Sequence, residues 1–148
     1  MPASTPFRGG EGIVYDRGHV YFATKSDDRV WDLDIAAETV RVLYDRATDG
    51  IQQLRGVDNV AVTQGGDLLV AEDGGNMELV MLNPDGLALA LLRVEGQPFS
   101  ELAGPAFDPE GTRLYFSSQR GSDGRGVTYE VRGPFESMRR RSLSLPSA

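Results

Sequence analysis

The feature that most constrains this chain is a hairpin unit that occurs three times. Its central copy covers residues 56–75, where two short apolar runs are joined by a glycine-containing turn. This pattern predicts an antiparallel β-hairpin. Related copies begin near Glu11 and Gly104, with 47 residues between Glu11 and Asp58 and 45 between Asn59 and Gly104. A repeat of this length that holds several short strands is typical of β-propeller blades.

The repeat predicts an all-β, β-propeller-type fold of about three four-stranded antiparallel blades, half of a six-bladed propeller. Eleven strands are expected, with very little helix. The expected boundaries are a flexible lead-in over residues 1–10, blades over about 11–46, 57–94 and 103–135, and a polar tail over 136–148. The third blade shows only three clear strands. An alternating run at 141–145 is a candidate fourth strand, and a disordered tail is the alternative.

Composition excludes several classes of function. The formal net charge is −7 and the pI is about 4.7, which argues against a nucleic-acid partner because phosphate binding needs clusters of Lys and Arg. The absence of cysteine excludes disulfides and thiol catalysis. No apolar run approaches the roughly 20 residues of a membrane span, and residues 1–10 lack the apolar core of a signal peptide. We therefore expect no membrane partner and a cytoplasmic location for the chain as written.

Acidic and amide side chains recur where the hairpins open. The residues concerned are Glu11, Asp58 and Glu101 before first strands, Glu72 and Asp73 after a second strand, and Gln119 as their counterpart in the third blade. Because blades radiate from one axis, such positions should converge at the mouth of the central channel. Carboxylate and amide oxygens there would suit calcium, and could also hold iron or manganese. The alternative is that these side chains cap turns by bonding to the backbone.

One aromatic residue is expected in the core. Trp31 alternates with Asp32 and Asp34 along the expected third strand of the first blade, which is the pattern of a strand buried on one face. Its side chain is therefore expected to pack inside the protein.

Several phrases, in order and spacing, resemble the C-terminal part of the PhoX-like family of bacterial alkaline phosphatases. They include GGEG at 9–12, VYFATK at 20–25, AEDG at 71–74, SELAGP at 100–105 and FSSQR at 116–120. The resemblance covers about residues 7–135. It implies a six-bladed propeller with calcium and iron in the channel mouth, hydrolysis of phosphate esters, and export to the periplasm for relatives with a complete N-terminus.

The resemblance also implies roles for particular residues. Glu11, Glu72 and Glu101 correspond to candidate metal-site acids, and Asp58 and Gln119 are further candidates. Gln119 and Arg120 are candidate substrate-binding residues. Arg120 in particular is a candidate clamp for the phosphate of a small phosphate-ester substrate, since arginine binds phosphate with two parallel hydrogen bonds.

Two functions stay open on the sequence. The first is a metal-dependent phosphoester hydrolase that is complete only in a larger assembly. The second is a non-catalytic propeller fragment that acts as a binding or interaction module. Closed propellers usually have four to eight blades, so we expect either a homodimer that closes the ring or a missing N-terminal half of the propeller.

Overall fold

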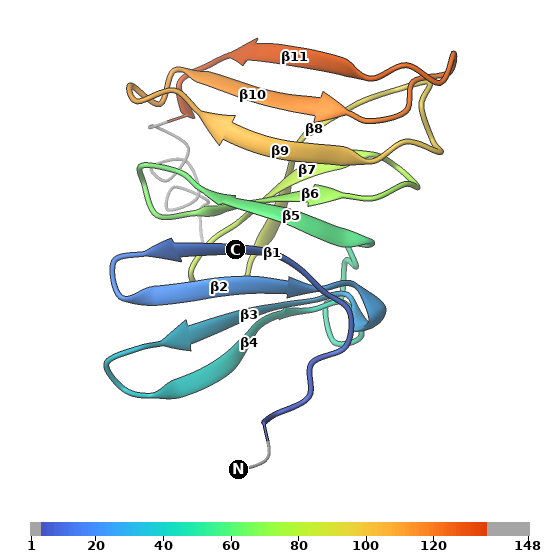
Figure 1. Ribbon diagram of the computed structural model, residues 1–148. Helices are drawn as coiled ribbons and strands as arrows, with labels where there is room; N and C mark the ends of the chain where they lie inside the picture. Colours follow the sequence, from blue (N-terminus) through green and yellow to red (C-terminus); the bar gives the residue numbers. More distant parts are fainter. Residues whose placement is uncertain (1–3, 136–148) are drawn as a thin grey trace, which may run out of the picture.

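The computed structural model describes residues 4–135, in which eleven strands form three antiparallel sheets (Figure 1). Blade 1 contains β1 (Gly10–Asp16), β2 (His19–Thr24), β3 (Arg29–Asp34) and β4 (Thr39–Asp45). Blade 2 contains β5 (Val57–Val62), β6 (Leu68–Glu72), β7 (Glu78–Leu82) and β8 (Ala88–Arg93). Blade 3 contains β9 (Leu102–Phe107), β10 (Arg113–Ser118) and β11 (Val127–Arg132). The all-β, propeller-type prediction is confirmed.

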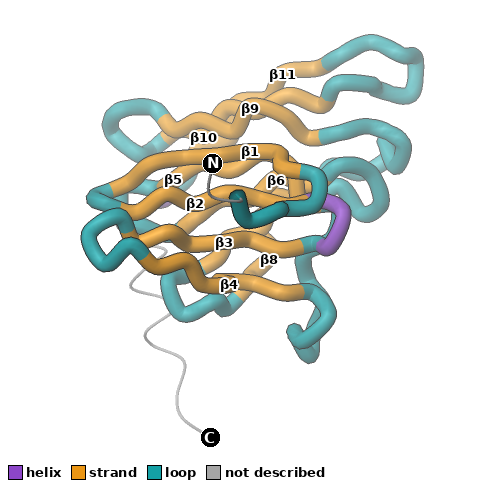
Figure 2. Tube along the Cα trace, turned by 60° about the horizontal axis from the view of Figure 1, so that its bottom comes forward, coloured by secondary structure: helices purple, strands orange, loops and turns teal. Residues whose placement is uncertain are grey.

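Each sheet is a simple meander, because the strands pair in sequence order. The described residues contain one short 3₁₀ turn, at Lys25–Asp27, and no helix long and apolar enough to cross a membrane. The candidate fourth strand of blade 3, at 141–145, lies outside the described residues. Figure 2 shows the three sheets lying one behind another.

The middle blade is buried on both faces, which its sequence explains. Along β6, Leu68 and Val70 point to blade 1, while Leu69 and Ala71 point to blade 3, because successive side chains of a strand alternate between its faces. All five residues of β6 are buried. Two apolar cores result, one on each side of blade 2, and they hold the three sheets together.

The first strands of the blades lie side by side as inner strands, with β5 between β1 and β9 (Figure 1). All three have an irregular register: the pairing shifts between Gly10 and Ile13 in β1, between Val57 and Val60 in β5, and opposite Tyr115 and Ser117 in β9. Such bulges bend a strand and change the direction of its side chains. Because pairing resumes beyond each bulge, the bulged residues remain part of these strands.

Trp31 is not in the core, contrary to the prediction. It is only partly buried and lies on the face of blade 1 opposite to the side chains that pack on blade 2. There it stacks against Phe22, and Phe7 contacts both rings edge-on, at centroid distances of 4.9 and 5.1 Å. The side chains alternate along β3, but the buried face is that of Val30 and Asp32, and the face of Trp31 has no neighbouring sheet within the described residues. Phe7 belongs to the expected lead-in, which therefore packs on blade 1 in part.

Candidate metal centre

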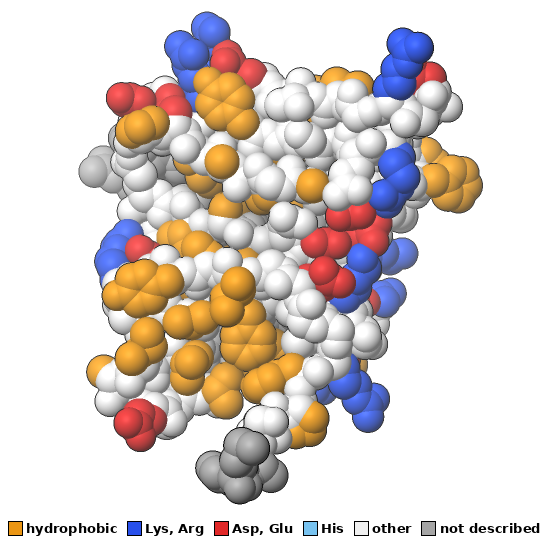
Figure 3. Space-filling view, viewed as in Figure 1, with side chains coloured by type: hydrophobic (Ala, Val, Ile, Leu, Met, Phe, Trp, Pro, Cys, Tyr) orange, Lys and Arg blue, Asp and Glu red, His pale blue; other side chains and the backbone are white. Residues whose placement is uncertain are grey.

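Three carboxylates from two blades meet at one rim of the sheets. Asp58 lies in the bulge of β5, Asp73 follows β6, and Glu101 directly precedes β9. One oxygen of each lies within 4.8 Å of the others, and Asp58 is buried. An isolated β-bridge joins Asp73 to Glu101, so the backbone itself holds these two residues together. Figure 3 shows acidic and basic side chains gathered on this flank of the molecule.

Two cationic side chains neutralise most of this charge. Lys25, at the end of β2, places Nζ 3.3 Å from an Asp58 oxygen and also donates to Asp73. Arg120 places Nη2 3.2 Å from a Glu101 oxygen and 3.6 Å from an Asp73 oxygen. Partial burial lowers the pKa of Lys25, but its hydrogen bonds to Asp73 and Asp58 outweigh this and raise the pKa above its ordinary value. Lys25 is therefore protonated at neutral pH.

Two amide side chains orient the acids. Asn59 donates to Asp58 over 2.6 Å, and its own oxygen accepts the backbone N–H of Gly104 at 3.3 Å, in the next blade. Gln119 donates to Glu101 over 2.8 Å, and its oxygen accepts from Arg120 at 3.0 Å. All three blades thus contribute to one connected polar cluster, the rim site, made of Lys25, Asp58, Asn59, Asp73, Glu101, Gln119 and Arg120.

Glu72 lies apart from the rim site although it is next to Asp73. Its side chain is fully buried, on the same face of β6 as Leu68 and Val70. One carboxylate oxygen accepts the backbone N–H of Arg55 and the other that of Glu78, both at 3.0 Å. Burial raises the pKa of Glu72 to about 7, against the opposing effect of these two hydrogen bonds. Glu72 therefore fits the alternative in which an acid at the end of a hairpin bonds to the backbone. It holds the backbone at Arg55 and at Glu78 to the end of β6.

Of the other predicted site residues, four lie in the rim site and one lies outside it. Asp58 and Glu101 lie together, with Gln119 and Arg120 beside Glu101. Glu11 is exposed and is not a member of the three-carboxylate group. Metal binding by any of these residues stays a prediction.

The sequence pattern placed Asp73 at the rim together with Glu72, although the resemblance implied a metal role only for Glu72, and Lys25 was missed as a site residue. Glu72 and Asp73 are adjacent at the end of β6, and alternation sends one inward and the other to the rim. Both faces of β6 are apolar, so the sequence pattern did not indicate which of the two acids points to the rim. No sequence signal pairs Lys25 with Asp73, which is 48 residues away.

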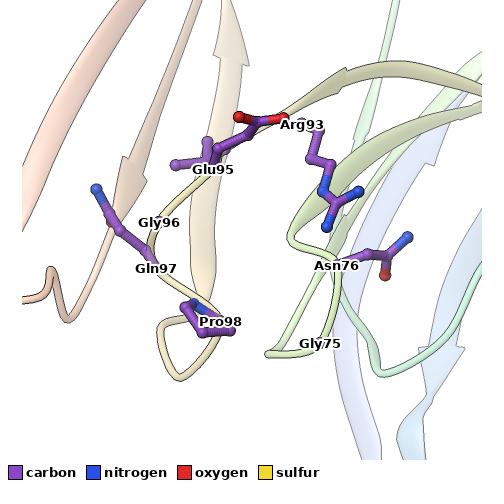
Figure 4. Close-up of a pocket in the computed structure, with 8 residues that line it drawn as sticks. Gly75, Asn76, Arg93, Glu95, Gly96, Gln97 and Pro98 are labelled. Carbon is purple, nitrogen blue, oxygen red and sulfur yellow. The ribbon is translucent and has the colours of Figure 1, made fainter.

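A shallow pocket of about 360 Å³ lies between the β6–β7 and β8–β9 loops (Figure 4). It is lined by Gly75, Asn76, Arg93, Val94, Glu95, Gly96, Gln97 and Pro98. The same two loops carry Asp73 and Glu101, so the pocket belongs to the same rim of the molecule. Its lining brings together no cluster of acids or nucleophiles.

Three blade-like sheets around adjacent inner strands, with charged groups converging on one rim, define a partial β-propeller with an acidic rim site. No family model and no curated protein matches the chain. Among solved structures, the chain is similar to a luciferin-regenerating enzyme, with a TM-score of 0.64 and 19% identity over 86% of this chain and 46% of that one. It is also similar to regucalcin, a calcium-binding protein from Agrobacterium tumefaciens strain C58, with a TM-score of 0.59 and 19% identity over 86% of this chain and 41% of that one.

These similarities concern the fold. The chain spans less than half the length of either structure, which agrees with three blades of a larger propeller. They also correct the resemblance to the PhoX-like phosphatases, which was wrong: no family model supports it, and the structural neighbours are other propeller proteins. The phrases that suggested it lie along strands of the blades and in the adjoining loops: VYFATK covers most of β2, and FSSQR covers the end of β10. The expectation of phosphatase activity, which rested on that resemblance, loses its support, and the comparisons do not support iron either.

Proposed function

We propose that the rim site binds a divalent cation, with calcium favoured over other metals. The observation that carries the proposal is the convergence of Asp58, Asp73 and Glu101, with three carboxylate oxygens within 4.8 Å of one another. Calcium takes six to eight oxygen ligands at roughly 2.3–2.6 Å and tolerates irregular geometry. Solvent water, and the Gln119 amide oxygen once Arg120 has moved away from it, would complete the shell. The similarity in fold to a protein described as calcium-binding supports this choice.

The formal charge of the rim site indicates which side chains a bound ion would displace. Three carboxylates face Lys25 and Arg120, which leaves a formal charge of −1. A divalent cation that displaces both side chains leaves the same formal charge. Binding is therefore an exchange in which two side-chain cations compete with the metal. This competition predicts a weak site, with a dissociation constant on the order of 10⁻⁴–10⁻³ M, the range of low-affinity calcium modules.

Isothermal titration calorimetry with calcium tests the proposal. Asp73→Asn should abolish or reduce binding at least tenfold, because Asp73 is the carboxylate that contacts both Lys25 and Arg120. Asp123→Asn is the matched control, since its side chain is 64% exposed and lies outside the rim site. Binding that is absent in the unaltered chain, or that both variants weaken equally, would show that the three acids serve only as partners of Lys25 and Arg120.

A further inference from the structure

The face of blade 1 that points away from blade 2 is an apolar surface four strands wide. Two cross-strand rows cover it: Ile13, Phe22, Trp31 and Val42 form one, and Tyr15, Val20, Leu33 and Val40 form the other. We call these eight side chains the blade 1 face. Ile13 is 68% exposed and Tyr15 65%, and neither row contains a charged residue. Figure 3 shows hydrophobic side chains gathered over blade 1.

The outer face of blade 3, at the opposite end of the molecule, carries polar and charged side chains. The face of blade 3 that points away from blade 2 carries Tyr115, Ser117, Thr128, Glu130 and Arg132. The Tyr115 hydroxyl donates to Glu130 over 3.0 Å, and Arg132 donates to the same carboxylate over 2.7 Å. Packing this blade 3 face on the blade 1 face would bury charged groups against two apolar rows, which costs free energy. A contact between first and third blades, as in a ring closed by two copies, is therefore disfavoured.

We propose that the blade 1 face binds the blade 1 face of a second copy of this chain, forming a two-fold symmetric dimer. Such an interface places the same patch on both subunits and pairs apolar rows with apolar rows. Arg29, whose guanidinium lies 5.7 Å from the Trp31 ring at the border of the face, is already paired with Asp27 and Asp45. Two sheet faces pack well in this way, about 10 Å apart. Eight side chains per copy are fewer than the roughly 20–30 residues that each partner contributes to a standard interface, so the dimer interface lies at the lower end of specific interfaces. We therefore expect a dissociation constant in the micromolar range.

Analytical ultracentrifugation of the full chain across micromolar concentrations tests the proposal. The unaltered chain should pass from monomer to dimer as its concentration rises. Ile13→Glu should weaken dimerisation at least tenfold, because it places a charge within an apolar row of the interface. Thr128→Glu, an exposed change on the edge strand β11 of the blade 3 face, should dimerise like the unaltered chain.

Trp31, the single tryptophan of the chain, lies in the first row of the blade 1 face and gives a second readout. Its quenching by acrylamide should increase on dilution in the unaltered chain and stay constant in Ile13→Glu. Circular dichroism would establish that Ile13→Glu is folded, which its exposed position leads us to expect. A chain that is monomeric throughout, as expected if another propeller blade covers this face, would overturn the proposal. So would a dimer that Thr128→Glu disrupts as strongly as Ile13→Glu.

Discussion

At the residue scale, Lys25 has a central place in the rim site. It is the only lysine of the chain, and it links the end of β2 in blade 1 to two acids of blade 2. A mobile ammonium group can leave such a position at lower cost than a backbone group. Lys25 therefore stabilises the rim while no metal is bound and competes with the metal for the same oxygens.

Replacing this competitor should strengthen calcium binding. Lys25→Met leaves three carboxylates opposed by Arg120 alone, so calcium affinity should rise by about tenfold or more, since opposite charges a few Å apart interact strongly at a partly buried site. The free energy of unfolding without calcium should fall at the same time. Arg125→Met, at a side chain that is 88% exposed, is the control and should change neither quantity. Calcium affinity that is unchanged or lower in Lys25→Met would contradict the proposal that calcium displaces the Lys25 side chain.

Glu72 predicts a pH dependence of stability. Its pKa is about 7 in the folded protein, compared with 4.5 as the ordinary value. Between these values the folded state binds more protons than the unfolded state, so the contribution of Glu72 to the free energy of unfolding falls as pH rises through this window and is constant above about pH 7. The full change would be roughly 3 kcal/mol.

Urea denaturation at a series of pH values from about 5 to 8 measures this effect. Glu72→Gln should reduce the downward slope, because the amide does not titrate. Glu110→Gln, in an exposed turn, should leave the slope as it is. A slope that is identical in Glu72→Gln and in the unaltered chain would mean that Glu72 is ionised throughout the window.

Local sequence patterns do not determine the direction and the partners of every side chain. Alternation and turn residues predict where a strand lies, but at a strand end they do not decide whether Glu72 or Asp73 points to the rim. The ion pairs of Lys25 depend on how blade 1 packs on blade 2, which no local pattern contains. Trp31 shows the same limit, because alternation places it on a face without saying whether another sheet covers that face.

At the element scale, the bulges of the inner strands connect the blades to the site. Gly12, in the bulge of β1, lies against the bulge of β5: a Cβ atom added there would lie 2.6 Å from the carbonyl oxygen of Asp58 and 2.8 Å from the Cα of Asn59. Glycine permits this close approach of two backbones. The contact fixes the position of Asp58, whose carboxylate belongs to the rim site.

Gly12→Ala should therefore destabilise the protein and disturb the site. The added methyl group meets backbone rather than a flexible side chain, so we expect a loss of about 1–3 kcal/mol together with weaker calcium binding. Gly10→Ala is the matched control, since a Cβ atom at this position two residues away meets nothing within 4 Å. Thermal unfolding and calorimetry of the two variants check the expectation. Equal stability of the two variants would mean that β1 and β5 can move apart at Gly12 without lowering the free energy of unfolding.

At the scale of the whole molecule, the number of strands and the three-sheet architecture could be predicted from the sequence. The 45- and 47-residue intervals and the apolar second strands set the repeat, and the stacked sheets follow from burying both faces of β6. The chemistry of the two outer faces could not be predicted. It depends on the direction of each row of side chains, and only the assembled sheets show that one end is apolar and the other charged.

The most direct test of the rim site is a crystal structure of the chain soaked in calcium, or in manganese for its anomalous signal. We expect one ion within roughly 2.0–2.6 Å of carboxylate oxygens of Asp58, Asp73 and Glu101, with Lys25 Nζ and the Arg120 guanidinium moved away from these oxygens. An ion-free rim at millimolar metal, with Lys25 still bonded to Asp58 and Asp73, would contradict it.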